Sequence, residues 1–157
     1  MHLVVGVDVH KLEHVAVAID GAGRCCGQLR FTNTGRGADR FIGWLTGLGV
    51  GRVVIGIENA GGYGATLSVA LARAGFDALD VPPWRTAPER RALGPAKTDA
   101  QDAEAIARVV ARYRARLAPA LQPELVPGSR PIGDSASSGG RRPHESDPAP
   151  ASCLGQR

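Results

Sequence analysis

The chain has 157 residues, enough for one domain of ordinary size with any remainder forming a linker or tail. Hydrophobic residues make up 43% and charged residues 22%, a balance that excludes a fibrous or wholly disordered protein. The net charge of +4 and a pI near 9.4 suggest a polyanionic partner such as nucleic acid, although many basic surfaces are only solvated faces.

Three extended runs open the chain, at residues 3–9, 14–20 and 25–31, and a Gly-rich turn separates the second from the third. They predict a meander of three strands. Apolar residues then recur at the helical spacing i, i+3, i+4 and i+7 between residues 37 and 48. A helix is therefore expected after the meander.

The run RVVIGIE at residues 52–58 is rich in β-branched residues, as is typical of a strand covered on both faces in a parallel sheet. A helix is expected next, over residues 63–74, because Gly75 supplies the usual residue beyond a helix end. A short strand over residues 76–81 follows. The pattern has become strand, helix, strand.

Two further helical stretches complete the predicted elements. The first is short, around residues 88–93, and stops before a Gly-Pro break. The second opens at Thr98, which is expected to form a T-x-x-Q capping box with Gln101, and runs to about Leu117. Three meander strands followed by α-β-α-β-α predict an α/β fold, a ribonuclease H-like mixed sheet flanked by helices.

The composition changes near Leu121, where Pro, Gly, Ser and Arg take over and apolar periodicity ends. All of the positive excess lies before this change, with 15 Lys and Arg against 11 Asp and Glu in residues 1–122. We therefore expect one folded domain over residues 1–118 and a disordered tail over residues 119–157, which has no apolar face to bury.

Two carboxylates lie where a strand should be apolar. Asp8 sits in a Val-rich strand, where an unpaired buried charge would cost several kcal/mol, unless it caps a turn or pairs with Lys11. Glu58 closes the most apolar strand of the chain. If these strands are neighbours, the two carboxylates lie side by side and repel unless they share a proton or a cation.

Asp99 and Asp102 stand at i and i+3 at the start of the last helix, on roughly one face. They could serve only the helix dipole, which is worth ~0.3 to 1 kcal/mol for each acid. The predicted fold nevertheless brings them to Asp8 and Glu58. Oxygen-only ligands suit Mg²⁺ or Mn²⁺, so we predict that these four acids are the metal-binding and catalytic residues of a phosphoryl-transfer site.

Basic residues surround the last acids in the sequence, and we predict that they contact a nucleic-acid backbone, with a solvated face as the alternative. Those predicted to do so are Arg85, Arg90, Arg91, Lys97, Arg108, Arg112 and Arg116. Trp84 and Tyr63 could stack on bases or pack in the core. His10 and His14 straddle a turn without further ligands in a zinc pattern, so no metal is assigned to them.

The sequence also predicts the compartment. The N-terminus has no basic stretch followed by an apolar one, and no uncharged run approaches the ~20 residues that a membrane span needs. Cys25, Cys26 and Cys153 show neither a C-x-x-C spacing nor a disulfide framework. We expect a cytoplasmic protein with free thiols and no membrane partner.

Three motifs resemble the IS110 family of transposases in order, spacing and content: VGVDVHK at 5–11, IENAGGYG at 57–64 and AKTDAQDAEAIA at 96–107. The resemblance covers about residues 3–117, and K-T-D-x-x-D-A is its most specific element. It implies a RuvC-like domain whose acidic tetrad maps onto Asp8, Glu58, Asp99 and Asp102 with Mg²⁺ between them. It further implies DNA strand exchange, a guide RNA from the element, and a separate C-terminal domain with a nucleophilic serine.

The chain departs from that family pattern after the long helix, where the expected tail stands in place of the serine domain. The serine nucleophile is assigned to none of the serines there, which are Ser129, Ser135, Ser137, Ser138, Ser146 and Ser152. We expect a truncated transposase that does not recombine DNA alone but associates with itself or with a full-length copy. A frameshift would explain the tail, and translating the downstream DNA in three frames tests this.

Two other functions fit parts of the sequence. The first is a noncatalytic nucleic-acid-binding fragment that interferes with full-length transposase, and Mg²⁺ titration would separate it from a metal enzyme. The second is a fragment of an actin-like ATPase, whose first strand also carries a G-x-D. The K-T-D-x-x-D-A helix has no role in such an ATPase, and its Gly-rich adenosine motif is missing here.

Overall fold

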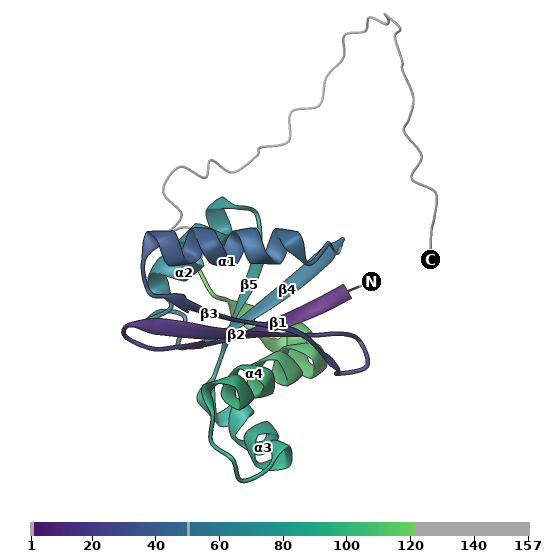
Figure 1. Cartoon of the computed structure of the whole chain (residues 1–157). Helices are drawn as coiled ribbons and strands as arrows, with labels where there is room; N and C mark the ends of the chain where they lie inside the picture. The colour runs from purple at the N-terminus through teal and green to yellow at the C-terminus, as the bar shows by residue number, and fades with distance from the viewer. Residues whose placement is uncertain (1, 50, 122–157) are drawn as a thin grey trace, which may run out of the picture.

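A mixed sheet of six strands forms the centre of the chain, in the order β3-β2-β1-β4-β5-β6. The structure is a computed structural model that describes residues 2–49 and 51–121; the remainder of the predicted tail, residues 122–157, lies outside the described residues. Helices cover both faces of the sheet (Figure 1). The predicted ribonuclease H-like arrangement is confirmed.

The first three strands form the predicted meander, and the later ones extend the sheet from the other side of β1. β1 pairs antiparallel with β2 and parallel with β4, and β4 pairs parallel with β5. The strands are β1 (His2–Val9), β2 (Glu13–Ile19), β3 (Cys25–Thr32), β4 (Arg52–Glu58), β5 (Asp77–Val81) and β6 (Ala118–Pro119). β1 and β4 are therefore the central strands.

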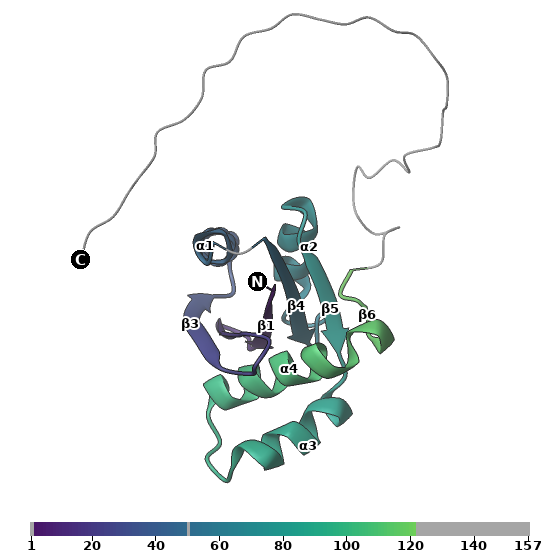
Figure 2. The ribbon, with the colours of Figure 1, turned by 90° about the vertical axis from the view of Figure 1, so that its right-hand side faces the viewer.

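The helices lie in separate layers (Figure 2). α1 (Gly35–Gly47) and α2 (Ala65–Arg73) cover one face of the sheet, and α4 (Asp99–Tyr113) covers the other, against β1, β2 and β4. α3 (Pro83–Leu93) packs on the outer side of α4. No helix among the described residues combines the length and apolar character of a membrane span.

Alternation along β1 explains why the two faces differ. Leu3, Val5 and Val7 belong to the core shared with α1 and α2, where they meet Phe41 and Leu45. Since successive side chains point to opposite faces, the residues between them face α4. Burying apolar side chains of this size stabilises the fold by roughly 1.5–3 kcal/mol each.

Glycines on the α4 face let this helix lie close to the sheet. Gly6 and Gly56 are partners in the parallel register of β1 and β4. A Cβ on Gly6 would overlap the carbonyl oxygen of Ala103, and one on Gly56 would overlap the side chain of Val110. Larger residues here would push α4 away from the strands. The close contact brings the first turn of α4 to the carboxyl ends of β1 and β4.

The last predicted helix begins where expected and ends earlier. The Thr98 hydroxyl accepts a hydrogen bond from the Gln101 backbone N–H at 3.2 Å, but the Gln101 side chain donates to the Leu93 carbonyl at 3.5 Å. Only half of the predicted capping box is therefore formed. After Tyr113 the chain makes a 3-10 turn (Arg114–Arg116) and then β6, which includes the predicted boundary at residues 118 and 119.

Candidate functional site

The carboxyl ends of β1 and β4 hold the first two predicted acids side by side. Val7 and Ile57 are the last register partners of these strands, and Asp8 and Glu58 each follow by one residue. Each acid stands two residues after one of the glycines described above and so shares the α4 face. Asp8 is buried, with 6% of its surface exposed, and the Glu58 side chain is 15% exposed.

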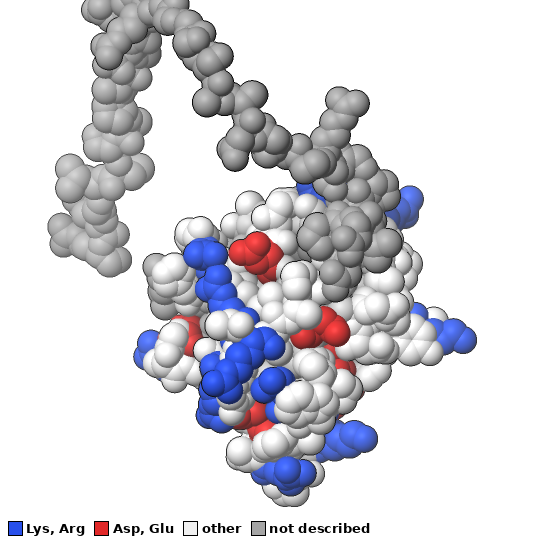
Figure 3. Space-filling model, turned by 180° about the vertical axis from the view of Figure 1, so that it is seen from behind, with Lys and Arg blue, Asp and Glu red and all other residues white. Residues whose placement is uncertain are grey.

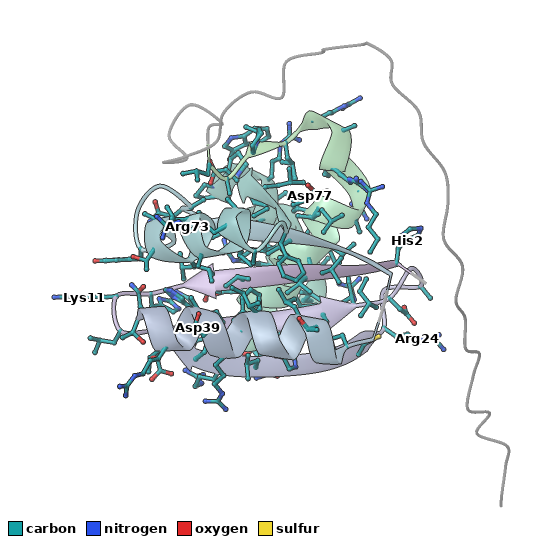
Figure 4. The ribbon with its side chains drawn as sticks, turned by 90° about the horizontal axis from the view of Figure 1, so that it is seen from above. His2, Lys11, Arg24, Asp39, Arg73 and Asp77 are labelled. Atoms are coloured by element: carbon teal, nitrogen blue, oxygen red, sulfur yellow. The ribbon has the colours of Figure 1, made fainter. Side chains whose placement is uncertain are left out.

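The first turn of α4 brings Asp99 to Asp8. Ligand atoms of Asp8, His10 and Asp99 all lie within 4.8 Å of one another. His10 Nε2 is 2.9 Å from Asp8 Oδ2 and 3.6 Å from Asp99 Oδ1. Lys11, the alternative partner predicted for Asp8, instead points away from the fold and forms no ion pair with any described residue (Figure 4).

A second cluster contains the other two acids, joined by an arginine from α3. Arg90 donates from Nη2 to Glu58 at 2.8 Å and from Nε to Asp102 at 2.6 Å. The hydroxyl of Thr86, one turn earlier in α3, donates to Glu58 at 2.6 Å and accepts from Arg90 Nη1 at 2.8 Å. The four predicted acids therefore lie around one site but have different partners.

Burial raises the pKa of Asp8 above its ordinary value, because water no longer solvates the ionised carboxylate. The neighbouring His10 acts in the opposite sense, while the negative charges of Asp102 and Glu58 raise the pKa further. A positive ion among these carboxylates would relieve both the desolvation and the repulsion. The donors are oxygens, with one imidazole nitrogen nearby, and this set fits a divalent cation.

An open cleft of about 950 Å³ lies over the acids. Asp8 and Glu58 line it from the sheet and Asp102 from α4, and Arg91 and Lys97 line it from α3 and the loop that follows. Asp99 is beside the cleft rather than in its lining. The combination of acids at the base and exposed cations at the rim can hold both a metal and an anionic substrate.

The turn after β4 shapes one wall of this cleft. Asn59, directly after Glu58, adopts a left-handed backbone with φ of 59°, a conformation that Asn tolerates better than most residues. The backbone N–H of Ala60 donates to Asp80 on β5 at 3.2 Å. This bond ties the turn to the neighbouring strand.

The predicted nucleic-acid contacts differ in what they touch. Of the seven predicted basic residues, only Arg91 and Lys97 are exposed, line the cleft and form no ion pair in the described part of the chain. Arg90 also lines the cleft, but its guanidinium bonds Glu58, Asp102 and Thr86, so in this structure it is not free for a phosphate as predicted. Its position on α3, over the acids, is the physical reason.

The predicted arginine stripe along α4 does not form one free surface. Arg108 pairs with Glu104 at 2.7 Å, and Arg112 pairs with Glu89 of α3. Arg116 lies in the 3-10 turn beyond the helix end. Figure 3, which views the molecule from behind, accordingly shows acidic side chains among the basic ones over its lower part, where the α3 and α4 layer lies.

The two aromatic candidates are on the surface, so the alternative of core packing is wrong for both. Trp84 is 67% exposed and Tyr63 is 50% exposed. Tyr63 lines the cleft, whereas Trp84 carries the guanidinium of Arg85 at 4.3 Å from its ring centroid. Arg85 therefore stacks on an aromatic ring outside the cleft.

Sequence reasoning missed three residues of the site. His10 was given no metal, yet it lies between Asp8 and Asp99; its position two residues after a strand acid is a signal that could have placed it there. Thr86 and Arg30 show no comparable signal. Arg30 on β3 donates to Asp99 at 3.1 Å, and the two residues are far apart in the chain.

Comparisons with known proteins agree with this fold. The family model of the DEDD transposase domain of IS110, described as a transposase, matches residues 5–125. RuvC from Thermus thermophilus is similar with a TM-score of 0.57 and 18% identity, covering 74% of this chain and 99% of that chain. RuvC from T. thermophilus in complex with a Holliday junction substrate has a TM-score of 0.54 and 17% identity, covering 76% and 99%. No curated protein matches the sequence.

Proposed function

Because the chain belongs to the IS110 family of transposases, we propose that its RuvC-like domain holds a divalent cation, Mg²⁺ or Mn²⁺, and cleaves and transfers DNA strands during transposition. One observation carries this proposal. Carboxylates from three separate segments, β1, β4 and the start of α4, converge at one end of the sheet beneath an open cleft.

Asp8, Glu58, Asp99 and Asp102 would hold the cation, and His10 is near enough to add a nitrogen ligand. When bound, the cation supplies Lewis-acid stabilisation of the negative charge that develops on the phosphate oxygens. The residues of the chain position the acids for this task. Thr86 fixes Glu58, and Arg30 fixes Asp99.

DNA is the proposed substrate, held by Arg91 and Lys97 at the rim of the cleft. Their charges would neutralise backbone phosphates next to the acids, which otherwise repel DNA. RuvC with a Holliday junction shares the fold, which supports branched DNA as the form to test first. The guide RNA and the association with full-length transposase remain predictions of the family resemblance.

The test is cation binding by the full chain, measured by the loss of the free Mn²⁺ signal in electron paramagnetic resonance and by Mg²⁺ calorimetry. Asp8→Asn removes one ligand charge without changing size, and we expect it to weaken Mn²⁺ binding by about tenfold or more, equivalent to ~1.4 kcal/mol. Asp39→Asn is the matched control, because Asp39 is exposed on α1, on the opposite side of the sheet from α4 (Figure 4). Equal Mn²⁺ binding by wild type and Asp8→Asn would contradict the proposed site.

A second function, nucleic-acid binding without catalysis, is favoured by the ion pairs of Arg90. This side chain satisfies Glu58 and Asp102 without any metal. If the domain only binds nucleic acid, the wild-type chain should bind branched DNA while leaving the Mn²⁺ signal unchanged, and Asp8→Asn should bind DNA equally well.

A further inference from the structure

The acids of the site are divided by their partners. Among the described residues, the Asp8 side chain bonds only the imidazole of His10, at 2.9 Å. Asp99 has Oδ1 at 3.6 Å from the same imidazole, while its Oδ2 accepts a hydrogen bond from Arg30 at 3.1 Å. Glu58 and Asp102 face a guanidinium that is always charged. Within this part of the chain, Asp8 and the Oδ1 atom of Asp99 are therefore without a guanidinium partner, whereas Glu58 and Asp102 share one.

All three guanidinium nitrogens of Arg90 form hydrogen bonds within the site. Each of its nitrogens donates inside the site: Nε to Asp102, Nη2 to Glu58 and Nη1 to the Thr86 hydroxyl. Thr86 is fully buried, and the Arg90 side chain is only 30% exposed. A cation binding Glu58 and Asp102 together has to displace these hydrogen bonds.

We propose that Arg90 is a resident counter-cation of this site, which competes with the divalent cation for Glu58 and Asp102. The proposal rests on the proposed function. Metal ions then bind in sequence. The first ion binds beside Asp8 and Asp99, and a second binds only when Arg90 leaves Glu58 and Asp102. Arg90 is thus a positioning residue that controls occupancy.

The cleft offers the released guanidinium another partner. Arg90 lines the cleft together with Arg91, so a backbone phosphate of DNA bound in the cleft would lie near both side chains. Guanidinium groups bind phosphate as well as carboxylate through paired N–H donors. Because binding linkage is reciprocal, DNA that takes Arg90 should strengthen the second metal step, and the metal should strengthen DNA binding.

The test counts Mn²⁺ ions bound to the full chain without DNA, using electron paramagnetic resonance, for wild type, Arg90→Gln and Arg85→Gln. At the same Mn²⁺ concentration we expect wild type to bind one ion and Arg90→Gln to bind two. The affinity of Arg90→Gln for the second ion should be at least about tenfold higher than that of wild type. Arg85→Gln removes the same charge from another residue of α3, which lies outside the cleft and has no bond to these acids, and should bind like wild type.

A purely structural role for Arg90 makes a different prediction. In that case Arg90→Gln would lower the melting temperature equally with and without Mg²⁺. If Arg90 is a counter-cation, the metal-free variant should melt lower than wild type, and Mg²⁺ should raise its melting temperature more than it raises that of wild type. Arg90→Lys, which keeps the charge but cannot bridge both acids in the same way, should bind the second ion with intermediate affinity.

These outcomes separate this proposal from the proposed function. If wild type and both Arg90 variants bind the same number of ions with the same affinity, the counter-cation is overturned while the metal site stands. If neither wild type nor the Arg90 variants, all of which keep Asp8, bind Mn²⁺, the proposed function itself fails. Should Arg90→Gln not fold, equal second-step affinities of Arg90→Lys and wild type overturn the counter-cation.

Discussion

Asp8 shows how one residue sets the chemistry of the site. It is buried beside three other carboxylates, those of Glu58, Asp99 and Asp102, and its only side-chain hydrogen bond within the described residues is to His10. Such surroundings raise the pKa of a carboxyl group, and a nearby cation lowers it again. The cost of ionising Asp8 is therefore a measure of how strongly the site attracts a metal.

His14 is buried beneath the segment that carries Asp8 and His10, and it holds the backbone of His10 in place. Its Nδ1 accepts the backbone N–H of His10 at 3.3 Å, and its ring stands edge-on to Phe31. Nε2 is buried and has no partner among the described residues. Burial lowers the pKa of His14 below its ordinary value, because the charged imidazolium is poorly solvated there.

The lowered pKa predicts a pH-dependent stability. The unfolded chain takes up the His14 proton near pH 6.5, whereas the folded chain does so only at lower pH. Stability contributed by neutral His14 is therefore complete above about pH 6.5 and falls as the pH drops below it, by at most ~1.4 kcal/mol per pH unit. Urea unfolding between pH 5.5 and 7.5 measures this, and His14→Gln should flatten the slope.

The control for this prediction is His2→Gln, at an exposed position at the start of β1, which should keep the wild-type slope. His10, whose backbone N–H bonds His14, is present in both variants. An unchanged slope in His14→Gln would mean that other groups cause the pH dependence.

At the scale of elements, α4 is the part of the fold that completes the site. Its first turn carries Asp99 and Asp102, and its close contact with Gly6 sets their distance from Asp8. Thr98 holds that turn in place through its cap. The positions of Asp99 and Asp102 thus depend on the Thr98 hydroxyl and on the lack of a side chain at Gly6.

The cap predicts separate effects on stability and on metal binding. Thr98→Ala should destabilise the fold by about 1 kcal/mol, because it leaves a backbone N–H of the first turn unsatisfied. Thr34→Ala is the matched variant, since Thr34 caps α1 in the same way, accepting from Gly37 N–H at 3.1 Å. Urea unfolding should show similar losses for both. Mn²⁺ titration should show weaker binding for Thr98→Ala alone, and equal binding by both would mean that the cap does not position the acids.

At the scale of the whole molecule, the basic side chains differ in whether an acidic partner neutralises them. Arg91 and Lys97 stand at the rim of the cleft without ion pairs in the described chain, while Arg108 and Arg112 are paired with glutamates. A paired arginine is already neutralised locally, so it releases fewer counterions from DNA than a free one. The DNA path should therefore follow the cleft rather than α4.

The salt dependence of DNA binding tests this path. Arg91→Gln and Lys97→Gln should each reduce the slope of log affinity against log salt by about 1. Arg108→Gln and Arg112→Gln should leave the slope close to that of wild type. Fluorescence anisotropy with labelled branched DNA over a range of NaCl concentrations measures all four. A larger effect of the α4 pair would place the DNA along that helix instead.

Much of the architecture follows from local patterns. The β-branched runs and apolar spacings predicted all strands but the short β6, and β1 and β4 are the neighbours that the expected ribonuclease H-like order requires. The end of the last helix was misplaced at Leu117, because the chain bends into a 3-10 turn to pair Ala118 with β5. Pairing across the sheet decided that end, and helix periodicity does not report it.

The sequence by itself determined the fold class and the family. The fold class in turn predicts that Asp8 and Glu58 meet, because the ribonuclease H-like strand order places their two strands side by side. Only the tertiary structure decided which cations face these acids. Arg90 lies 12 residues from Asp102 and 32 from Glu58, and it reaches both because α3 docks on the outside of α4. Side-chain pairing of this kind depends on how whole layers pack, and no local spacing encodes it.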